Sequence, residues 1–214
     1  MGKLTDDKMQ SFYCNQKFWW LTVNLEKYNT YSCCAADPQK ADIAWVKDNP
    51  GKLFNTPQLQ HDRRLMLDNQ PAPSCQNACW NTESQGLPSR RTIMLGNQKT
   101  HSSIESNPEV LNIVVGSDCN LTCVYCCKFY SSAWLRDVVA TPYRVDSSDD
   151  RFVINNTDKI LSQLSQKDLR QSANRQALLD EVTNLYQSPV LKSVMITGGE
   201  PFLYLDLEKL VQSI

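Results

Sequence analysis

Cysteine is the residue type in this chain with the greatest capacity for chemistry, and the 214 residues contain nine of them. Three lie within eight residues, as Cys119, Cys123 and Cys126, with the spacing C-x3-C-x2-C. Thiolates are soft ligands that favour iron–sulfur clusters and zinc. The spacing differs from the bacterial and plant ferredoxin patterns, each of which supplies four cysteines. With three ligands, a cubane keeps one iron open for a substrate or cofactor.

The elements around this loop are predicted from apolar patterning. Residues 110–115 are a short apolar run with the composition of a buried strand, and residues 190–197 are a second one that ends at Gly198-Gly199-Glu200-Pro201. Residues 175–186 between them have helical apolar spacing. This order predicts parallel strands joined by right-handed crossovers, whose following loops emerge at one edge of the sheet. We therefore expect the cysteine loop and the Gly-Gly-Glu-Pro turn to face each other.

Together, these two motifs resemble the signature of radical S-adenosylmethionine (radical SAM) enzymes. The shared features are C-x3-C-x2-C with an aromatic residue, here Tyr125, before the third cysteine, and Gly-Gly-Glu-Pro after the second strand. The resemblance covers about residues 108–214 and implies a [4Fe–4S] cluster on Cys119, Cys123 and Cys126 that binds S-adenosylmethionine. It also implies the cofactor-binding residues, which are Tyr125, Gly198, Gly199, Glu200 and Pro201.

The chemistry of that family is reductive cleavage of S-adenosylmethionine to a 5′-deoxyadenosyl radical, which removes a hydrogen atom from a substrate. The implied fold is an α/β partial (β/α)6 TIM-like barrel with more strands than the two found in this stretch. We therefore expect a C-terminally truncated barrel, inactive alone. The resemblance further implies an electron donor such as flavodoxin or ferredoxin, and by analogy a peptide or protein substrate.

The first half holds the other cysteines, at positions 14, 33, 34, 75 and 79. It resembles the SPASM or twitch auxiliary-cluster modules of radical SAM enzymes over about residues 12–95, although it precedes the barrel instead of following it. The resemblance implies a second iron–sulfur cluster, with structural zinc as the alternative. The predicted ligands of that cluster are Cys14, Cys34, Cys75 and Cys79.

A small cysteine-rich α+β module at residues 1–97 is therefore predicted ahead of the barrel portion at residues 108–214. Strands are predicted at residues 18–25 and 31–35, joined by a turn at 26–30. Thr56-Pro57 is typical of a helix start, and that helix is expected to end near residue 68. Further helices are predicted at residues 129–137, 158–164 and 205–214. Arg90-Arg91 is interpreted as a solvated pair.

Composition excludes several other classes of protein. The net charge is −1 with no basic block, so nothing signals nucleic-acid binding. The sequence contains no run of 18 apolar residues and no apolar segment behind a basic start, so neither a membrane span nor a secretory signal is predicted. A cytoplasmic location follows, where clustered cysteines bind metal or do chemistry. Two alternatives stay open, a zinc-binding interaction module and an electron carrier with closed clusters.

Overall fold

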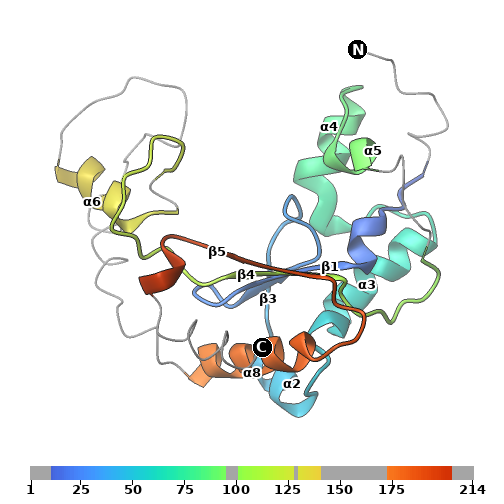
Figure 1. Ribbon diagram of the computed structural model, residues 1–214. Coiled ribbons are helices and arrows are strands. Elements are labelled where there is room, and N and C mark those ends of the chain that lie inside the picture. Colours follow the sequence, from blue (N-terminus) through green and yellow to red (C-terminus); the bar gives the residue numbers. More distant parts are fainter. Residues whose placement is uncertain (1–10, 95–100, 128–129, 141–172, 204–214) are drawn as a thin grey trace.

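A mixed five-stranded sheet organises the computed structural model, which describes residues 11–94, 101–127, 130–140 and 173–203 (Figure 1). The strand order is β3-β2-β1-β4-β5, and helices accompany the sheet in an α/β arrangement. The predicted helices at 158–164 and 205–214 lie outside the described residues. The strands are β1 (Trp20–Asn24), β2 (Asn29–Tyr31), β3 (Gln39–Lys40), β4 (Val110–Val114) and β5 (Ser193–Thr197).

Parallel pairing joins the two halves of the chain in one sheet. Trp20 of β1 pairs with Val110 of β4, which in turn pairs with Ser193 of β5. The parallel β4–β5 pair was predicted, whereas the pairing of β1 with β4 was not. As a result the loops after β1, β4 and β5 share one edge of the sheet, called here the carboxyl edge. The opposite edge, where these strands begin, is called the amino edge.

The hairpin of the first half differs from its prediction. Its turn occupies residues 25–28, with Tyr28 at a φ of 52°, and the return strand β2 is complete at Tyr31. The predicted return strand at 31–35 is therefore wrong. An earlier turn pairs Asn24 with Asn29, so Cys33 and Cys34 lie beyond the strand in a bend. Because β2 runs antiparallel to β1, these cysteines reach the amino edge.

Helix α3 (Pro57–Leu67) confirms the helix predicted after Thr56, whose hydroxyl accepts from Leu59 N at 3.4 Å. The predicted helix at 129–137 is found as α6 (Ser132–Ala140), and that at 175–186 as α8 (Ala173–Tyr186). The other helices are α2 (Ile43–Asp48), α4 (Asn81–Ser84) and α5 (Arg90–Met94). Short 3-10 helices are η1 (Asn15–Phe18), η2 (Leu53–Asn55), η3 (Pro73–Cys75) and η7 (Pro201–Leu203), and η4 (Gln76–Trp80) is a π-helical segment.

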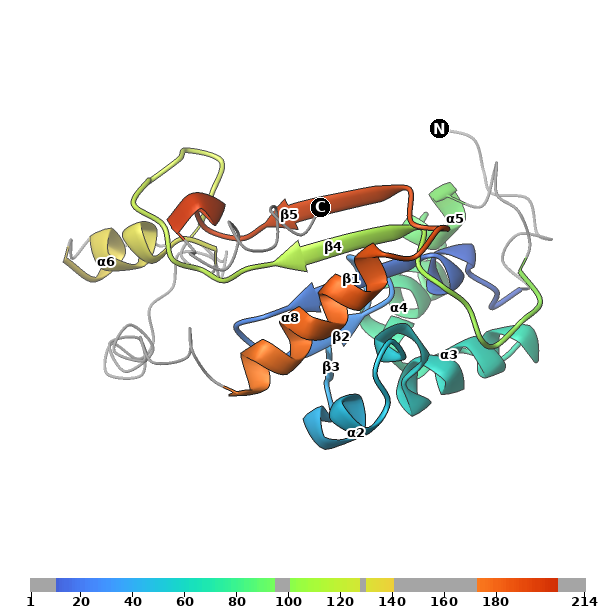
Figure 2. The ribbon, with the colours of Figure 1, turned by 60° about the horizontal axis from the view of Figure 1, so that its bottom comes forward.

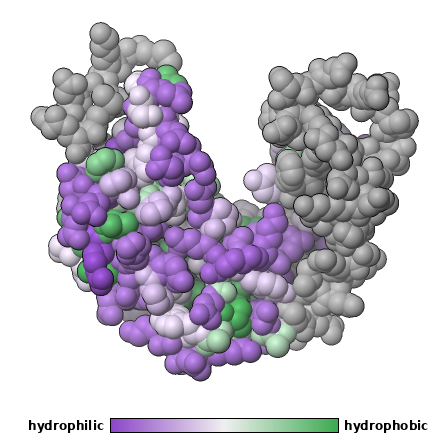
Figure 3. Space-filling model, turned by 180° about the vertical axis from the view of Figure 1, so that it is seen from behind, coloured by the Kyte–Doolittle hydropathy of each residue, from purple (hydrophilic) through white to green (hydrophobic). Residues whose placement is uncertain are grey.

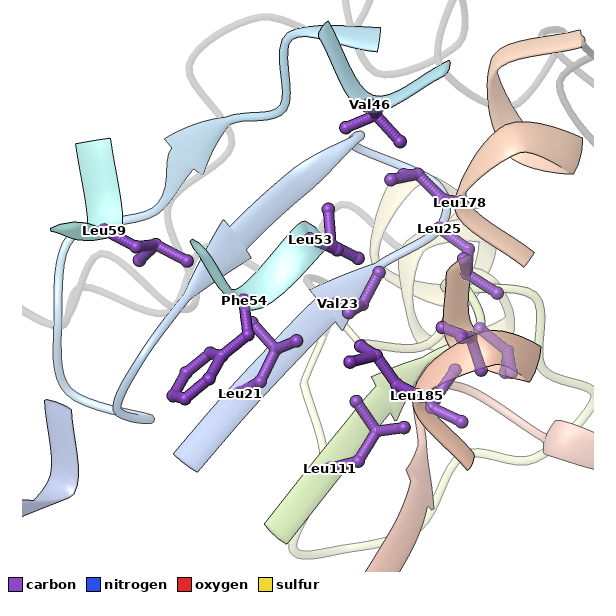
Figure 4. Packing of buried hydrophobic residues seen from close by; sticks show 13 residues of the cluster. Leu21, Val23, Leu25, Val46, Leu53, Phe54, Leu59, Leu111, Leu178 and Leu185 are labelled. Carbon is purple, nitrogen blue, oxygen red and sulfur yellow. The ribbon is translucent and has the colours of Figure 1, made fainter. Parts of the chain in front are cut away.

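The main core lies between the sheet and helices α2 and α8, which cover the same face (Figures 1 and 2). Figure 4 shows side chains of β1, β4 and α8 converging there, with residues around α2 and η2 closing one side. Alternate residues of the strands point to the other face, where Thr197 Oγ1 donates to Asn112 Oδ1 at 3.0 Å. The buried cluster comprises Leu21, Val23, Leu25, Val46, Leu53, Phe54, Leu59, Leu111, Ile113, Val115, Leu178, Val182 and Leu185.

Buried polar side chains of helix α8 form hydrogen bonds with the first half of the chain and with the end of β4. The Glu181 carboxylate accepts from Gly51 N at 2.7 Å and from Leu53 N at 3.2 Å. One turn and a half earlier, Arg175 donates to Val115 O at 3.0 Å, where β4 leads into the cysteine loop. The crossover helix therefore positions the loop as well as burying the sheet.

The described strands form an open sheet, so the predicted partial barrel stays a prediction. Seen from behind, the described surface is largely hydrophilic, with apolar side chains scattered over it (Figure 3). No helix among the described residues combines the length and apolar character needed to span a membrane.

Replacing Leu111 with Ala tests this core. Leu111 is 0% exposed in the middle of β4, so we expect a loss of about 2–5 kcal/mol in the free energy of unfolding, measured by urea titration with circular dichroism. Leu87→Ala is the control, because Leu87 is 52% exposed and should change stability by less than about 0.5 kcal/mol. Equal losses in the two variants would contradict the packing described.

Candidate functional sites

The cysteine loop (residues 116–127) and the Gly-Gly-Glu-Pro turn are in direct contact at the carboxyl edge. Gly199 N donates to Gly116 O at 2.8 Å, and Glu200 N donates to Asp118 O at 2.8 Å. These main-chain bonds extend the β4–β5 pairing past the ends of the strands. The predicted encounter of the two motifs is therefore confirmed.

The two glycines are required by how closely the backbones approach. A Cβ on Gly199 would lie 2.2 Å from Asp118 O, and one on Gly198 would lie 2.5 Å from Gly116 O. Gly198 also has a φ of 134°, which side chains with a Cβ rarely adopt. At both positions a residue larger than glycine would therefore collide with the backbone of the cysteine loop.

Helix α6 holds the other side of the cysteine loop. Ser132 Oγ accepts from Cys119 N at 3.0 Å and donates to Cys119 O at 3.1 Å. Trp134 Nε1 donates to Cys123 O at 2.8 Å, and Arg136 donates to Cys119 O at 3.2 Å. These bonds tie the loop backbone to α6 at two of its cysteines, while the Cys119 thiol accepts from Leu121 N at 3.3 Å within the loop itself.

Cys119 is buried, whereas Cys123, Cys126 and Cys127 are half-buried. Among the described residues, no three Cys, His, Asp or Glu side chains converge as ligands of a single metal ion. Tyr125 projects from this loop, 93% exposed, and its pKa is raised mainly by a hydrogen bond with Cys123. The donor set of three soft thiols in one loop suits an iron–sulfur cluster. To hold it, the thiols would have to turn inward.

Two carboxylates stand beside the loop. Glu200 Oε1 accepts from Phe202 N at 3.2 Å, at the start of η7, whose first residue is Pro201. Glu26, which follows β1, accepts from Ser117 Oγ at 2.8 Å. Sequence reasoning missed Glu26, because its place depends on the β1–β4 pairing, for which the sequence gives no local signal.

A second group of thiols lies at the amino edge, at the other end of the sheet from α6 (Figure 1). Cys14 precedes η1, and Cys75 and Cys79 lie in η3 and η4, where all three pack in one buried cluster. Cys33 is also buried, and a Cys33 thiolate would raise the pKa of each of the other three thiols. The structure therefore groups Cys33 with Cys14, Cys75 and Cys79, while the predicted Cys34 is exposed.

Burial controls the ionisation of these four thiols, called here the amino-edge cysteines. Desolvation, supported by the neighbouring thiols, raises the pKa of Cys14 to about 12 and that of Cys75 to about 11. The pKa values of Cys33 and Cys79 are also raised, again chiefly by burial. Four thiolates together need a positive partner, because each raises the cost of ionising the next.

Buried charged residues brace the segments that carry these thiols. Arg91 pairs with Glu83, donates to Tyr13 O at 3.2 Å, and lies over the Trp80 ring at 5.0 Å. The interpretation of Arg90-Arg91 as a solvated pair is therefore wrong for Arg91. The guanidinium has to be buried because it links the segment before Cys14 to the segment around Cys79.

Comparisons of the chain with protein-family models, curated proteins and solved structures found no significant match.

Replacing Gly199 with Ala should displace the cysteine loop, because the added Cβ would clash with Asp118 O at 2.2 Å. We expect a lower melting temperature and faster proteolysis of the loop than in the parent chain. Gly86→Ala is a matched control: Gly86 has a φ of 72° but nothing within 4 Å of its Cβ position, so it reports backbone strain alone. Similar loop cleavage in both variants would refute the close approach.

The raised thiol pKa values predict alkaline sensitivity of the metal-free protein. Unfolded thiols ionise near pH 9.0, whereas Cys14 and Cys75 keep their protons until about 12 and about 11 when folded. The unfolded chain then binds fewer protons, so stability falls as pH rises from about 9 to 12, on the order of 1 kcal/mol per pH unit per thiol. Urea titrations should show a flatter profile for Cys14→Ala/Cys75→Ala, and an unchanged one for Cys34→Ala. An equally steep profile in the double variant would count against this assignment.

Proposed function

We propose that this chain carries the cofactor-binding opening of a radical SAM enzyme. The observation that supports this most is the contact between the cysteine loop and the Gly-Gly-Glu-Pro turn, joined by the bonds from Gly199 and Glu200. Radical SAM chemistry needs a three-thiolate cluster beside a group that receives the methionyl moiety. Both motifs lie at the carboxyl edge, where α/β folds bind their ligands.

Cys119, Cys123 and Cys126 would hold the [4Fe–4S] cluster. When bound, the cluster and S-adenosylmethionine would supply a one-electron reductive cleavage that yields a radical for hydrogen abstraction. Glu200 would receive the methionyl ammonium, since its carboxylate is half-buried at the mouth of the loop. Tyr125 is exposed beside Cys123 and free to cover the adenine.

The sheet supports a barrel as the complete fold. β1, β4 and β5 run parallel, and α8 covers one face in the manner of an outer barrel helix. The other face presents polar side chains such as Asn112 and Thr197, which suit the interior of an enzyme barrel.

The amino-edge cysteines would form a second metal centre. They supply four soft thiols, which suits an auxiliary [4Fe–4S] cluster; zinc is the alternative. A tetrahedral zinc requires sulfurs about 3.8 Å apart, from Zn–S bonds of about 2.3 Å, and the described thiols do not converge in this way. An iron–sulfur cluster holds its four thiolates further apart than a zinc ion does, and it is the group proposed for this centre.

The two centres would lie at opposite ends of β1, separated by at least about 17 Å, the length of a five-residue strand. The amino-edge centre would therefore be separate from the cofactor site at the cysteine loop. A peptide or protein substrate, a flavodoxin or ferredoxin donor, and a cytoplasmic location complete the proposal. All nine cysteines are free thiols, which accords with a reducing compartment.

Replacing Cys123 with Ala tests the loop cluster. After anaerobic reconstitution we expect the variant to lose the iron that responds to S-adenosylmethionine in the EPR spectrum of the reduced protein, and to keep the iron at the amino edge. Cys127→Ala is the matched control, because Cys127 is also half-buried in the same loop but is not a proposed ligand.

Other outcomes separate the alternatives. Stoichiometric zinc without iron would identify a zinc-binding module. Iron whose EPR signal ignores S-adenosylmethionine would identify an electron carrier. An unchanged response in Cys123→Ala would remove the loop from the cofactor site altogether.

A further inference from the structure

Lys17 is a buried cation beside the amino-edge cysteines. Its side chain is 1% exposed, in η1, three residues after Cys14. Burial of a lone ammonium is costly and favours its neutral form. Here Nζ donates to Asp62 Oδ2 at 2.7 Å and to Ser74 Oγ. The ammonium is therefore held in place, with two of its three protons engaged.

Asp62 is itself fixed by several donors. Its Oδ2 accepts from Lys17, from Ser74 Oγ at 2.5 Å and from Gln39 Nε2 at 3.2 Å. Ser74 immediately precedes Cys75 in η3, so this network reaches the thiol cluster through the chain itself. Lys17, Asp62 and Ser74 form a buried charged network that adjoins the thiol-bearing segments after Cys14 and before Cys75.

Both the thiols and the carboxylate act on this cation. Burial lowers the pKa of Lys17, but the net direction is upward, because a Cys75 thiolate and the charge and hydrogen bond of Asp62 all raise it. Cys14 adds a smaller contribution of the same sign. Conversely, Lys17 acts on Cys75 more strongly than Asp62 does. Lys17 is therefore the member of the pair whose charge has the larger effect on Cys75.

The side-chain amide of Gln16 has a buried donor that could also bond to a thiolate of this cluster. Gln16 Oε1 accepts from the Cys33 thiol at 3.2 Å, while its buried Nε2 has no hydrogen-bond partner among the described residues. Once Cys33 is a metal-bound thiolate it accepts instead of donating. Rotation of the amide would then direct Nε2 to the sulfur and satisfy both groups.

We propose that Lys17 is the charge partner of the metal centre held by Cys14, Cys33, Cys75 and Cys79, and that it sets the reduction potential of that centre. This inference rests on the proposed amino-edge centre. A cubane with four thiolates carries net negative charge, which increases on reduction. A fixed buried cation stabilises the reduced form of the centre and raises its reduction potential. The Asp62 carboxylate lowers the potential, but its charge has a smaller effect on Cys75 than that of Lys17.

The test uses the full chain with Cys119→Ala, Cys123→Ala and Cys126→Ala, so that iron reports the amino-edge centre alone. The parent and its variants are reconstituted with iron and sulfide, and midpoint potentials are measured by EPR-monitored redox titration. Asp62→Asn should shift the potential upward, because it removes the opposing charge. Lys17→Met/Asp62→Asn should shift it below the parent, and leaves no uncompensated charge buried. Lys17→Arg keeps the positive charge, so its midpoint potential should stay close to that of the parent.

Lys192→Met is the matched control, since it removes an equal charge from the exposed pair with Glu109, where Lys192 is 68% exposed. It should leave the potential unchanged. Shifts of the same sign in Asp62→Asn and in the double variant would overturn the proposal, since a packing defect alone would act in that way. A folded double variant that retains no iron, while Lys17→Arg retains it, supports the requirement for the cation.

Failure of the underlying site gives a different result. A parent chain that binds no iron at the amino edge rejects the centre, and the role of Lys17 with it. Bound iron with a potential indifferent to position 17 rejects the role of Lys17 alone.

Discussion

The parallel pairing of β1 with β4 is the interaction on which the rest of the structure depends. It makes one sheet from segments about ninety residues apart, with Trp20 opposite Val110. Each five-residue strand alone buries too little to be stable, and α8 supplies the missing cover through Leu178, Val182 and Leu185. The same helix fastens the first half through Glu181 and the start of the cysteine loop through Arg175. The helix that completes the core therefore also positions the cysteine loop.

This sheet assigns a different chemistry to each of its edges. At the carboxyl edge, backbone contact without intervening side chains brings Gly199 and Asp118 together and leaves half-buried thiols and carboxylates around an accessible loop. At the amino edge the four thiols are buried among charged side chains that are themselves buried and paired. The open loop suits a cofactor that must exchange. The buried amino-edge cysteines suit a permanent metal centre, whose reduction potential we propose is set by Lys17 and its partners.

Buried charge is a stability cost that this chain accepts at the amino edge. Arg63 has its pKa lowered to about 10 by burial, yet it donates to Phe54 O at 2.9 Å and to Asn55 Oδ1 at 2.8 Å. Lys17 and Arg91 are likewise buried and bonded. Such groups cost desolvation that apolar side chains would not, so their presence is better explained by positioning the cysteine segments than by stability.

Local sequence patterns were enough to predict the strand before the cysteine loop, the crossover helix α8, the strand that ends before Gly198, and the helix after Thr56 in the first half. These follow from local periodicity and capping, which need no partner to be recognised. Only the folded chain shows that Cys33 is buried near the other thiols while Cys34 is exposed, because both residues lie in the irregular segment after β2, where strand alternation does not decide which side chain points inward. Tertiary structure also placed Lys17, Glu26 and Arg91, ordinary charged residues in the sequence, which acquire their surroundings through contacts made between segments far apart in the chain.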